Sequence, residues 1–261
     1  MFNDFSPIDP DNVQPYVYED ERSLSLHFDM SSTQSRMLRA DPYALALDYT
    51  RTMMGFVLVQ PRPESILMIG LGGGSLAKYC HKHLPEADIT VVEINPHVIA
   101  MREAFFVPAD DARFRVVQDD GARFVARTGR RHDLLMVDGF SYDGQPEALS
   151  TPAFYRGCRA ALSPRGMAVV NLHNEEPECG VLVGRIARAF DGDLCTVPSE
   201  CAGNRLVFAG RSADFDRCSM DFEARWAALA EVHRRTLRSC AARFARGLHR
   251  PTATASAREI A

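Results

Sequence analysis

The chain has 261 residues, of which 46% are hydrophobic and 25% are charged, so it can bury the core of one large domain with a small appendage. Its net charge of −4 and pI of about 6.1 exclude a general electrostatic attraction to nucleic acid. No apolar run approaches the roughly 20 residues that span a bilayer, and the first residues lack the pattern of a signal peptide, so we expect no membrane partner. The seven cysteines include no C-x-x-C pair, which favours reduced thiols and a cytoplasmic location.

The N-terminal part predicts a small β unit followed by a helix. Residues 15–38 alternate between apolar and polar side chains, as in antiparallel hairpins. Residues 41–59 then carry a mostly apolar face at helical spacing, and the segment PRPES at 61–65 ends that helix. We therefore expect four regions: a β unit with a linking helix over 1–60, a cofactor-binding domain over 61–215, a covering helix over 216–250 and a disordered tail over 251–261.

Residues 66–93, ILMIGLGGGSLAKYCHKHLPEADITVVE, form the most informative stretch. An apolar run enters a glycine turn that contains Gly70, Gly72 and Gly74, a helical segment follows, and a second apolar run ends on Glu93. Glycines let the backbone approach a ligand, and the new helix presents free N–H groups there. A carboxylate roughly 20 residues further on can hold two ribose hydroxyls. The pattern predicts a site for an adenosine-containing cofactor.

The spacing of the glycines disfavours a dinucleotide. The Rossmann fingerprint is G-x-G-x-x-G, and Ser75 stands at its sixth position here, after two extra glycines. A cofactor without a pyrophosphate, such as a sulfonium nucleoside, suits this broad loop, so a nicotinamide-dependent oxidoreductase is a weaker hypothesis. A glycine-rich turn in another α/β protein is the plainest alternative.

Beyond residue 66, short apolar strands alternate with helical segments. This alternation is typical of a doubly wound, mostly parallel α/β sheet covered on both faces. The last two strands are joined by the short turn SECAGN, which predicts an antiparallel hairpin. The expected strands are 66–69, 89–93, 114–117, 133–138, 167–172, 193–197 and 204–209, and the expected helices include 94–106, 121–129 and 152–162.

Residues 220–248 predict one long amphipathic helix. Phe222, Trp226 and Leu237 are among the apolar residues on one side, while arginines lie mostly elsewhere. A basic amphipathic helix can bind an anionic partner, but a helix that covers the core and faces solvent is the simpler interpretation.

Four consecutive parallel strands end in glycine or acid. After the glycine loop come Glu93, the segment Asp119-Asp120-Gly121, and Asp138. The carboxyl ends of parallel strands meet at one edge of the sheet, where ligands bind. We expect Glu93 to bind the ribose, Asp120 to accept a hydrogen bond from the adenine amino group, and Asp138 to stand beside the reacting atoms.

The chain resembles the spermidine synthase (polyamine aminopropyltransferase) family over roughly residues 15–210. The resemblance rests on MIGLGGGSLAK, VVEINP, VVQDDGARF, VDGFSYDGQPEALSTPAFYRGCRAALSPRGMAVV and the glutamine of SSTQSR. It implies a class I methyltransferase-like domain behind a small N-terminal β unit, and usually a homodimer or tetramer. It also implies transfer of an aminopropyl group from decarboxylated S-adenosylmethionine to an amine such as putrescine, with no metal.

The resemblance also assigns roles to single residues. Glu93 and Asp120 match the acids on the ribose and adenine sides, and Asp138 matches the catalytic aspartate that takes a proton from the amine or orients it. Gln34 matches a glutamine that lines the site, and Tyr49 matches a tyrosine of the substrate site.

Three positions depart from the family pattern. Gly73 stands where the glycine loop carries an acid, Ser141 stands where D-x-x-D has its second aspartate, with Asp143 two residues on, and Arg51 stands where a glutamate follows the tyrosine. Fewer carboxylates weaken a site for cationic polyamines. Methyl transfer from S-adenosylmethionine on the same fold is therefore an alternative, as is a catalytically silent nucleoside-binding module.

Overall fold

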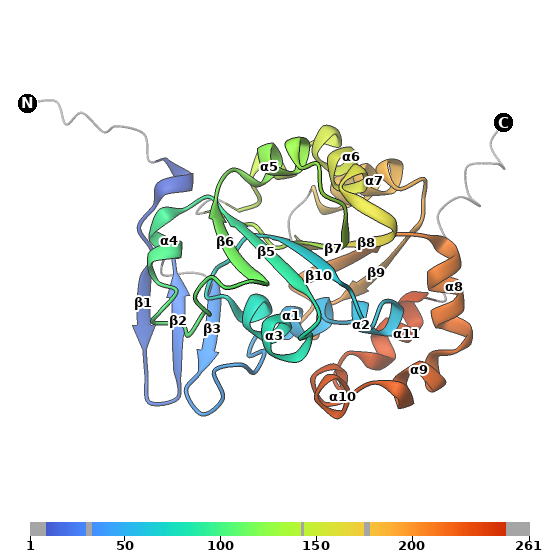
Figure 1. Ribbon diagram of the computed structural model, residues 1–261, viewed down its shortest axis with the longest axis horizontal. Helices are drawn as coiled ribbons and strands as arrows, with labels where there is room; N and C mark the ends of the chain where they lie inside the picture. Colours follow the sequence, from blue (N-terminus) through green and yellow to red (C-terminus); the bar gives the residue numbers. More distant parts are fainter. Residues whose placement is uncertain (1–8, 30–32, 142–143, 175–177, 249–261) are drawn as a thin grey trace, which may run out of the picture.

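The fold is built on two β-sheets of different size (Figure 1). The computed structural model describes residues 9–29, 33–141, 144–174 and 178–248. A three-stranded sheet near the N-terminus stands beside a seven-stranded sheet with helices on both faces. The predicted α/β architecture with a small N-terminal β unit is confirmed.

The small sheet is antiparallel and follows a short 3₁₀ helix, η1 (Pro10–Asn12). The side chain of Asp20 accepts hydrogen bonds from the backbone N–H groups of Arg22 and Ser23, which closes the first hairpin. The buried residues Leu26 and Met37 attach the sheet to the main core. Its strands are β1 (Tyr16–Glu19), β2 (Ser23–His27) and β3 (Ser35–Leu38).

The single helix predicted for residues 41–59 is wrong. The structure has two short helices, α1 (Asp48–Met53) and α2 (Phe56–Val59), with turns before them. A continuous helix would need the carbonyls of Leu45 and Ala46 for its own hydrogen bonds, but both accept from the guanidinium of Arg51. Gly55 lies between the two helices, and a Cβ there would lie only 2.7 Å from the ring of Phe244, which favours glycine at this position.

The seven-stranded sheet has the order β6-β5-β4-β7-β8-β10-β9. The strands from β6 to β8 are parallel, and β10 pairs antiparallel with both β8 and β9, as the hairpin prediction required. Every residue of β4 is buried, which is typical of a central strand covered on both faces. The strands are β4 (Ser65–Ile69), β5 (Asp88–Glu93), β6 (Phe114–Gln118), β7 (His132–Val137), β8 (Leu162–His173), β9 (Leu194–Pro198) and β10 (Asn204–Ala209).

Two apolar layers hold the helices against the sheet. In β4, Ile66 and Met68 belong to one buried cluster, and Leu67 and Ile69 belong to the other, as the alternation of side chains along a strand requires. The first layer packs against α3 (Ser75–His83) and α4 (Pro96–Ala100), and the second packs against α5 (Gly121–Arg127), α6 (Pro152–Ala160) and α7 (Cys179–Ala189) (Figure 1). A further 3₁₀ helix, η2 (Glu147–Leu149), precedes α6. The helix expected over 94–106 is shorter, since α4 ends at Ala100 and turns follow.

The single C-terminal helix predicted for residues 220–248 is also wrong. The structure has α8 (Ser212–Met220), α9 (Phe222–Ala228), α10 (Glu231–Leu237) and α11 (Ala241–Leu248). Leu229 and Ala230 adopt extended backbone angles, with ψ values of 145° and 147°, and Leu229 is buried. The apolar residues therefore reach the core from several short helices that bend around the sheet. The expected tail over 251–261 lies outside the described residues, and the region boundaries stay a prediction.

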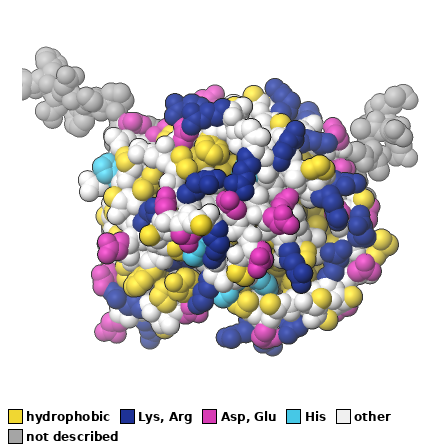
Figure 2. Space-filling view, viewed as in Figure 1, with side chains coloured by type: hydrophobic (Ala, Val, Ile, Leu, Met, Phe, Trp, Pro, Cys, Tyr) yellow, Lys and Arg dark blue, Asp and Glu magenta, His cyan; other side chains and the backbone are white. Residues whose placement is uncertain are grey.

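On the face seen in Figure 2, lysine and arginine side chains are interspersed with aspartate and glutamate. Within the described part of the chain, no helix combines the length and the apolar character needed to cross a bilayer.

Candidate functional site

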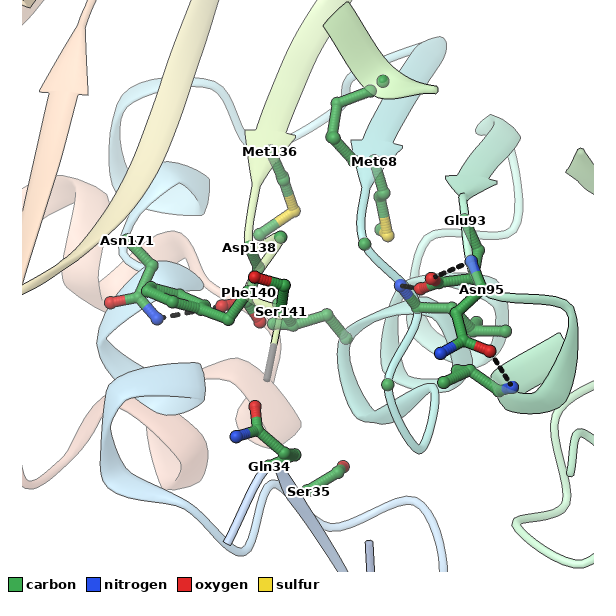
Figure 3. Close-up of a pocket in the computed structure, with 18 of the residues that line it drawn as sticks. Gln34, Ser35, Met68, Glu93, Asn95, Met136, Asp138, Phe140, Ser141 and Asn171 are labelled. Carbon is green, nitrogen blue, oxygen red and sulfur yellow. Dashed lines mark hydrogen bonds between the residues drawn. The ribbon is translucent and has the colours of Figure 1, made fainter. Parts of the chain in front are cut away.

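A cavity of about 300 Å³ opens at the carboxyl ends of the parallel strands (Figure 3). It lies between the large sheet, the small N-terminal sheet and α1. Asp143 lies outside the described residues, and Gly74 is not part of the wall. The predicted site residues that line it are Gln34, Tyr49, Gly70, Gly72, Glu93, Asp120, Gly121, Asp138 and Ser141.

The glycine loop owes its composition to two close approaches. Gly70 has a φ of 96°, and a Cβ there would overlap the carbonyl of Asp138, where β4 and β7 end side by side. Gly74 has a φ of 67° and forms the N-cap of α3, where a Cβ would overlap Val107. Gly74 therefore shapes the start of the helix, while Gly70 and Gly72 bring the backbone to the cavity.

Glu93 ends β5 with its carboxylate buried across the glycine loop. One oxygen accepts from the backbone N–H of Leu71 at 2.8 Å, and the other accepts from that of Asn95 at 2.9 Å. Burial raises the pKa of Glu93, and these N–H groups act in the opposite direction. The backbone N–H groups of Ile94 and Gly72 also act on this carboxylate, which is thus held by main-chain donors where it lines the cavity.

Asn95 was missed as a site residue, although it lies only two residues after the predicted strand end at Glu93. Its side-chain oxygen accepts from the N–H of His97 at 2.8 Å and caps α4. Its amide nitrogen donates to the carbonyl of Val13 at 2.8 Å, which ties the N-terminal segment to this rim of the cavity.

The adjacent acids Asp119 and Asp120 have different surroundings. Asp120 lines the cavity and caps α5 by accepting from the N–H of Arg123 at 2.8 Å. Asp119 is buried against the guanidinium groups of Arg123 and Arg127, which hold its pKa below the usual range. A Cβ on Gly121 would overlap the side chain of Ile69, so the cavity floor requires glycine there. Asp119 thus stabilises α5, and Asp120 remains for a ligand.

Asp138 follows β7 and is fixed from two sides. The hydroxyl of Tyr49 donates to one carboxylate oxygen at 3.2 Å, and the side-chain amide of Asn171 donates to the other at 2.8 Å. Burial raises the pKa of Asp138, while both donors favour its ionised form and lower the pKa. Burial and the neighbouring charge of Asp138 hold the pKa of Tyr49 well above its usual value, so Tyr49 is a neutral donor.

A second amide extends this network. Asn204, the first residue of β10, donates to the side-chain oxygen of Asn171 at 3.0 Å, and both residues line the cavity. Neither was foreseen as a site residue. The signal for Asn171 was an amide inside the apolar run MAVVNL, since a buried amide needs partners. Asn204 becomes a neighbour through strand pairing alone, opposite His173.

An aromatic pair forms another part of the wall. The rings of Phe140 and His173 stack with centroids 4.2 Å apart and an interplanar angle of 11°. Ser141 follows and is buried, and its hydroxyl donates to the carbonyl of Gly144 at 3.2 Å. This hydrogen bond connects Ser141 to Gly144, three residues later in the chain. Both Phe140 and His173 were missed by sequence reasoning.

The cavity is acidic. None of the lining residues that the structure describes is lysine or arginine, and His173 is its one histidine. The side chains of Met68 and Met136 also line the cavity, and their sulfur atoms suit an apolar or thioether group (Figure 3). An acidic pocket concentrates cationic ligands. Its carboxylates are Asp11, Asp48, Glu93, Asp120 and Asp138.

The family model of the spermine/spermidine synthase domain matches residues 46–179. The polyamine aminopropyltransferase of Chromobacterium violaceum is 38% identical over 198 residues, which is 76% of either chain. That of Neisseria meningitidis serogroup B is 35% identical over 199 residues, again 76% of both. The chain belongs to the spermine/spermidine synthase family.

Solved structures show the same fold. A probable spermidine synthase from Corynebacterium glutamicum superimposes with a TM-score of 0.65 at 17% identity, covering 79% of this chain and 82% of that one. A spermidine synthase in complex with the transition-state analogue AdoDATO gives 0.58 at 20% identity, with 85% and 87% covered. Human methyltransferase-like protein 13 in complex with SAH gives 0.54 at 22% identity, with 78% and 91% covered.

The structure explains why the glycine loop has Gly73 in place of the acid of the family motif, and it shows where Arg51 lies. A Cβ on Gly73 would lie 2.7 Å from the hydroxyl of Ser35 and 2.8 Å from the ring of Phe105, so an acidic side chain has no room there. Arg51 does not line the cavity. Besides the two carbonyls before α1, its guanidinium contacts the carboxylate of Glu200 at 3.4 Å.

The histidines of α3 lie away from the cavity. His81 contacts the carboxylate of Asp111 at 3.2 Å, and His83 packs beside the ring of Tyr79. In the described part of the chain, no group of three or more His, Cys, Asp and Glu side chains is placed to hold a metal ion.

Proposed function

We propose that the protein transfers an aminopropyl group from decarboxylated S-adenosylmethionine to an amine such as putrescine. One observation carries the proposal: in a member of the spermine/spermidine synthase family, Glu93, Asp120 and Asp138 line the same acidic cavity. Both substrates of such a reaction are cations, and the described lining residues include no lysine or arginine to repel them.

Glu93 and Asp120 would bind the nucleoside. The carboxylate of Glu93 would accept from the ribose hydroxyls, and Asp120 would accept from the adenine amino group. Gly70, Gly72 and Gly121 allow the close approach of the ligand, and Gln34 reaches the cavity from the N-terminal sheet (Figure 3). Met68 and Met136 would then lie near the sulfonium.

Asp138 would prepare the amine. A primary aliphatic amine has a pKa near about 10 and arrives protonated, so it must lose a proton before its nitrogen can attack. The raised pKa of Asp138 makes it a better proton acceptor than an exposed aspartate. The nitrogen then forms a bond to the propyl carbon as the carbon–sulfur bond breaks, and methylthioadenosine leaves without needing a proton. Tyr49 and Asn171 hold Asp138 in place for this step.

The test is a product assay by mass spectrometry with decarboxylated S-adenosylmethionine and putrescine. We expect spermidine and methylthioadenosine in equal amounts, and a loss of at least about 100-fold in kcat for Asp138→Asn. Asp216→Asn is the matched control, because Asp216 is an exposed aspartate of α8 outside the cavity wall. Wild-type turnover in the Asp138→Asn protein would remove Asp138 from this role.

Methyl transfer from S-adenosylmethionine is the second candidate. It is favoured by Gly73, where this chain lacks the acid of the family loop and Ser35 and Phe105 fill the space. The same assay with S-adenosylmethionine separates the two, since methylated and aminopropylated amines differ in mass. Binding of methylthioadenosine without turnover of either cofactor would instead favour the silent nucleoside-binding module.

We also propose a homodimer and a cytoplasmic location, as the family resemblance and the cysteine pattern led us to expect. Light scattering on the purified protein measures its mass directly. A monomer at micromolar concentration would contradict the dimer.

A further inference from the structure

The amine side of the cavity lacks carboxylates at two positions where the family motif has them. Ser141 replaces the second aspartate, and its hydroxyl is bound to Gly144. Arg51 replaces a glutamate and contacts Glu200 outside the cavity. A diamine carries a second ammonium group, and that charge needs a partner once it leaves water.

Asp48 is a carboxylate at a position that the family motifs around Ser141 and Arg51 do not include. It lies in the first turn of α1, is half-buried and lines the cavity. One oxygen accepts from the N–H of Tyr49 at 2.9 Å, and the other accepts from the N–H of Cys201 at 2.7 Å, in the turn between β9 and β10. The side chain of Cys201 also forms a hydrogen bond with Asp48, and these neutral groups fix the orientation of the carboxylate without neutralising its charge.

Arg51, the arginine in the same helix as Asp48, makes its contacts with other groups. Arg51, three residues later in α1, donates to two backbone carbonyls and contacts Glu200 at 3.4 Å. No lysine or arginine is present among the described lining residues. Asp48 therefore lines the cavity as a carboxylate that forms no ion pair with the lysine and arginine side chains that the structure describes.

Asp48 and Asp138 both interact with Tyr49. The hydroxyl of Tyr49 donates to Asp138, and Asp48 precedes Tyr49 in the chain. Both carboxylates add to the effect of burial in raising the pKa of Tyr49, so both charges act on the same phenol. The cavity lining thus contains two carboxylates whose charges both act on Tyr49.

We propose that Asp48 binds the distal ammonium of a diamine acceptor while Asp138 binds the amine that reacts. This assignment rests on the proposed function and makes Asp48 a specificity-determining residue. The carboxylate of Asp48 would replace the negative charge that is missing at Ser141 and Arg51, although it comes from a different position in the chain.

The test compares putrescine with butylamine, which has the same carbon chain and one amine. We expect the wild type to prefer putrescine, and Asp48→Asn to raise the KM for putrescine about 10- to 100-fold, as expected for a lost hydrogen bond to a charged group. The kcat for putrescine and the kcat/KM for butylamine should change less than about threefold. Asparagine retains an oxygen for the N–H of Cys201, so the turn is preserved.

Asp216→Asn is again the control, because Asp216 is an exposed aspartate of α8 outside the cavity wall. An equal loss for both amines in Asp48→Asn would show a structural role and overturn the assignment, as would an unchanged KM for putrescine. Titration of putrescine into the protein saturated with methylthioadenosine gives a second readout, in which Asp48→Asn should weaken binding by the same factor. Absence of turnover with every amine would refute the proposed function itself, and the assignment of Asp48 with it.

Discussion

Asn171 offers a sharp test of how the site controls the proton. Replacing it by leucine, a side chain of similar size, removes the 2.8 Å hydrogen bond to Asp138 and the partner of Asn204. Asn171 is the strongest of the groups that lower the pKa of Asp138 against the effect of burial. Without it the pKa of Asp138 rises further, so the carboxylate is protonated up to a higher pH.

The expected loss follows from the bond that is removed. A hydrogen bond to a charged group contributes about 1.5–3 kcal/mol, which corresponds to roughly 10- to 150-fold in rate. We expect kcat/KM at pH 7 to fall by that factor in Asn171→Leu. Because the base must be ionised to act, the acidic limb of the pH profile should move to higher pH, and activity should partly recover in alkali.

The assay is kcat/KM for putrescine across the pH range, with Asn204→Leu as the control. That variant keeps the bond between Asn171 and Asp138 and removes only the support behind it, so its profile should shift less. A thermal unfolding scan of each variant checks the fold. If the normalised profiles of Asn171→Leu and the wild type coincide, Asn171 does not tune Asp138, and the reasoning fails.

Three further predictions follow from single contacts. Burial raises the pKa of Asp138, so ionisation of this carboxyl group in the folded protein costs stability as the pH rises through its pKa. Asp138→Asn should therefore raise the Tm at neutral pH. This gain in Tm should vanish as the pH falls toward about 4. Gly73→Ala should lower the free energy of unfolding by about 1–3 kcal/mol in urea titrations, because its Cβ would press on Ser35 and Phe105; an unchanged midpoint would contradict the crowding. Glu93→Gln should weaken methylthioadenosine binding about 10- to 100-fold by calorimetry, and equal affinities would exclude Glu93 from the ribose site.

The errors in the predicted helices have a common origin. Over 220–248 the apolar residues recur at helical spacing, and no proline or glycine interrupts the run before Gly247. The break at Leu229 and Ala230 arises because Leu229 is buried, and because Arg225 one turn earlier donates to the carbonyls of Leu58 and Val59. Likewise Arg51 takes the carbonyls that would have extended α1 backwards. Local periodicity contains no information about partners so distant in the chain.

The strand segments along the chain, the glycine loop and the acids at the strand ends were all predicted from the sequence alone. They depend on local rules: apolar runs form buried strands, glycine permits a positive φ, and parallel strands end at one edge. The neighbours of Asp138 were decided by the tertiary structure. Tyr49, Asn171 and Asn204 come from α1, β8 and β10, and they meet only because β10 pairs with β8 and α1 packs beside them. Hydrogen bonds and burial between distant segments set the chemistry of the carboxyl group, and no local pattern encodes them.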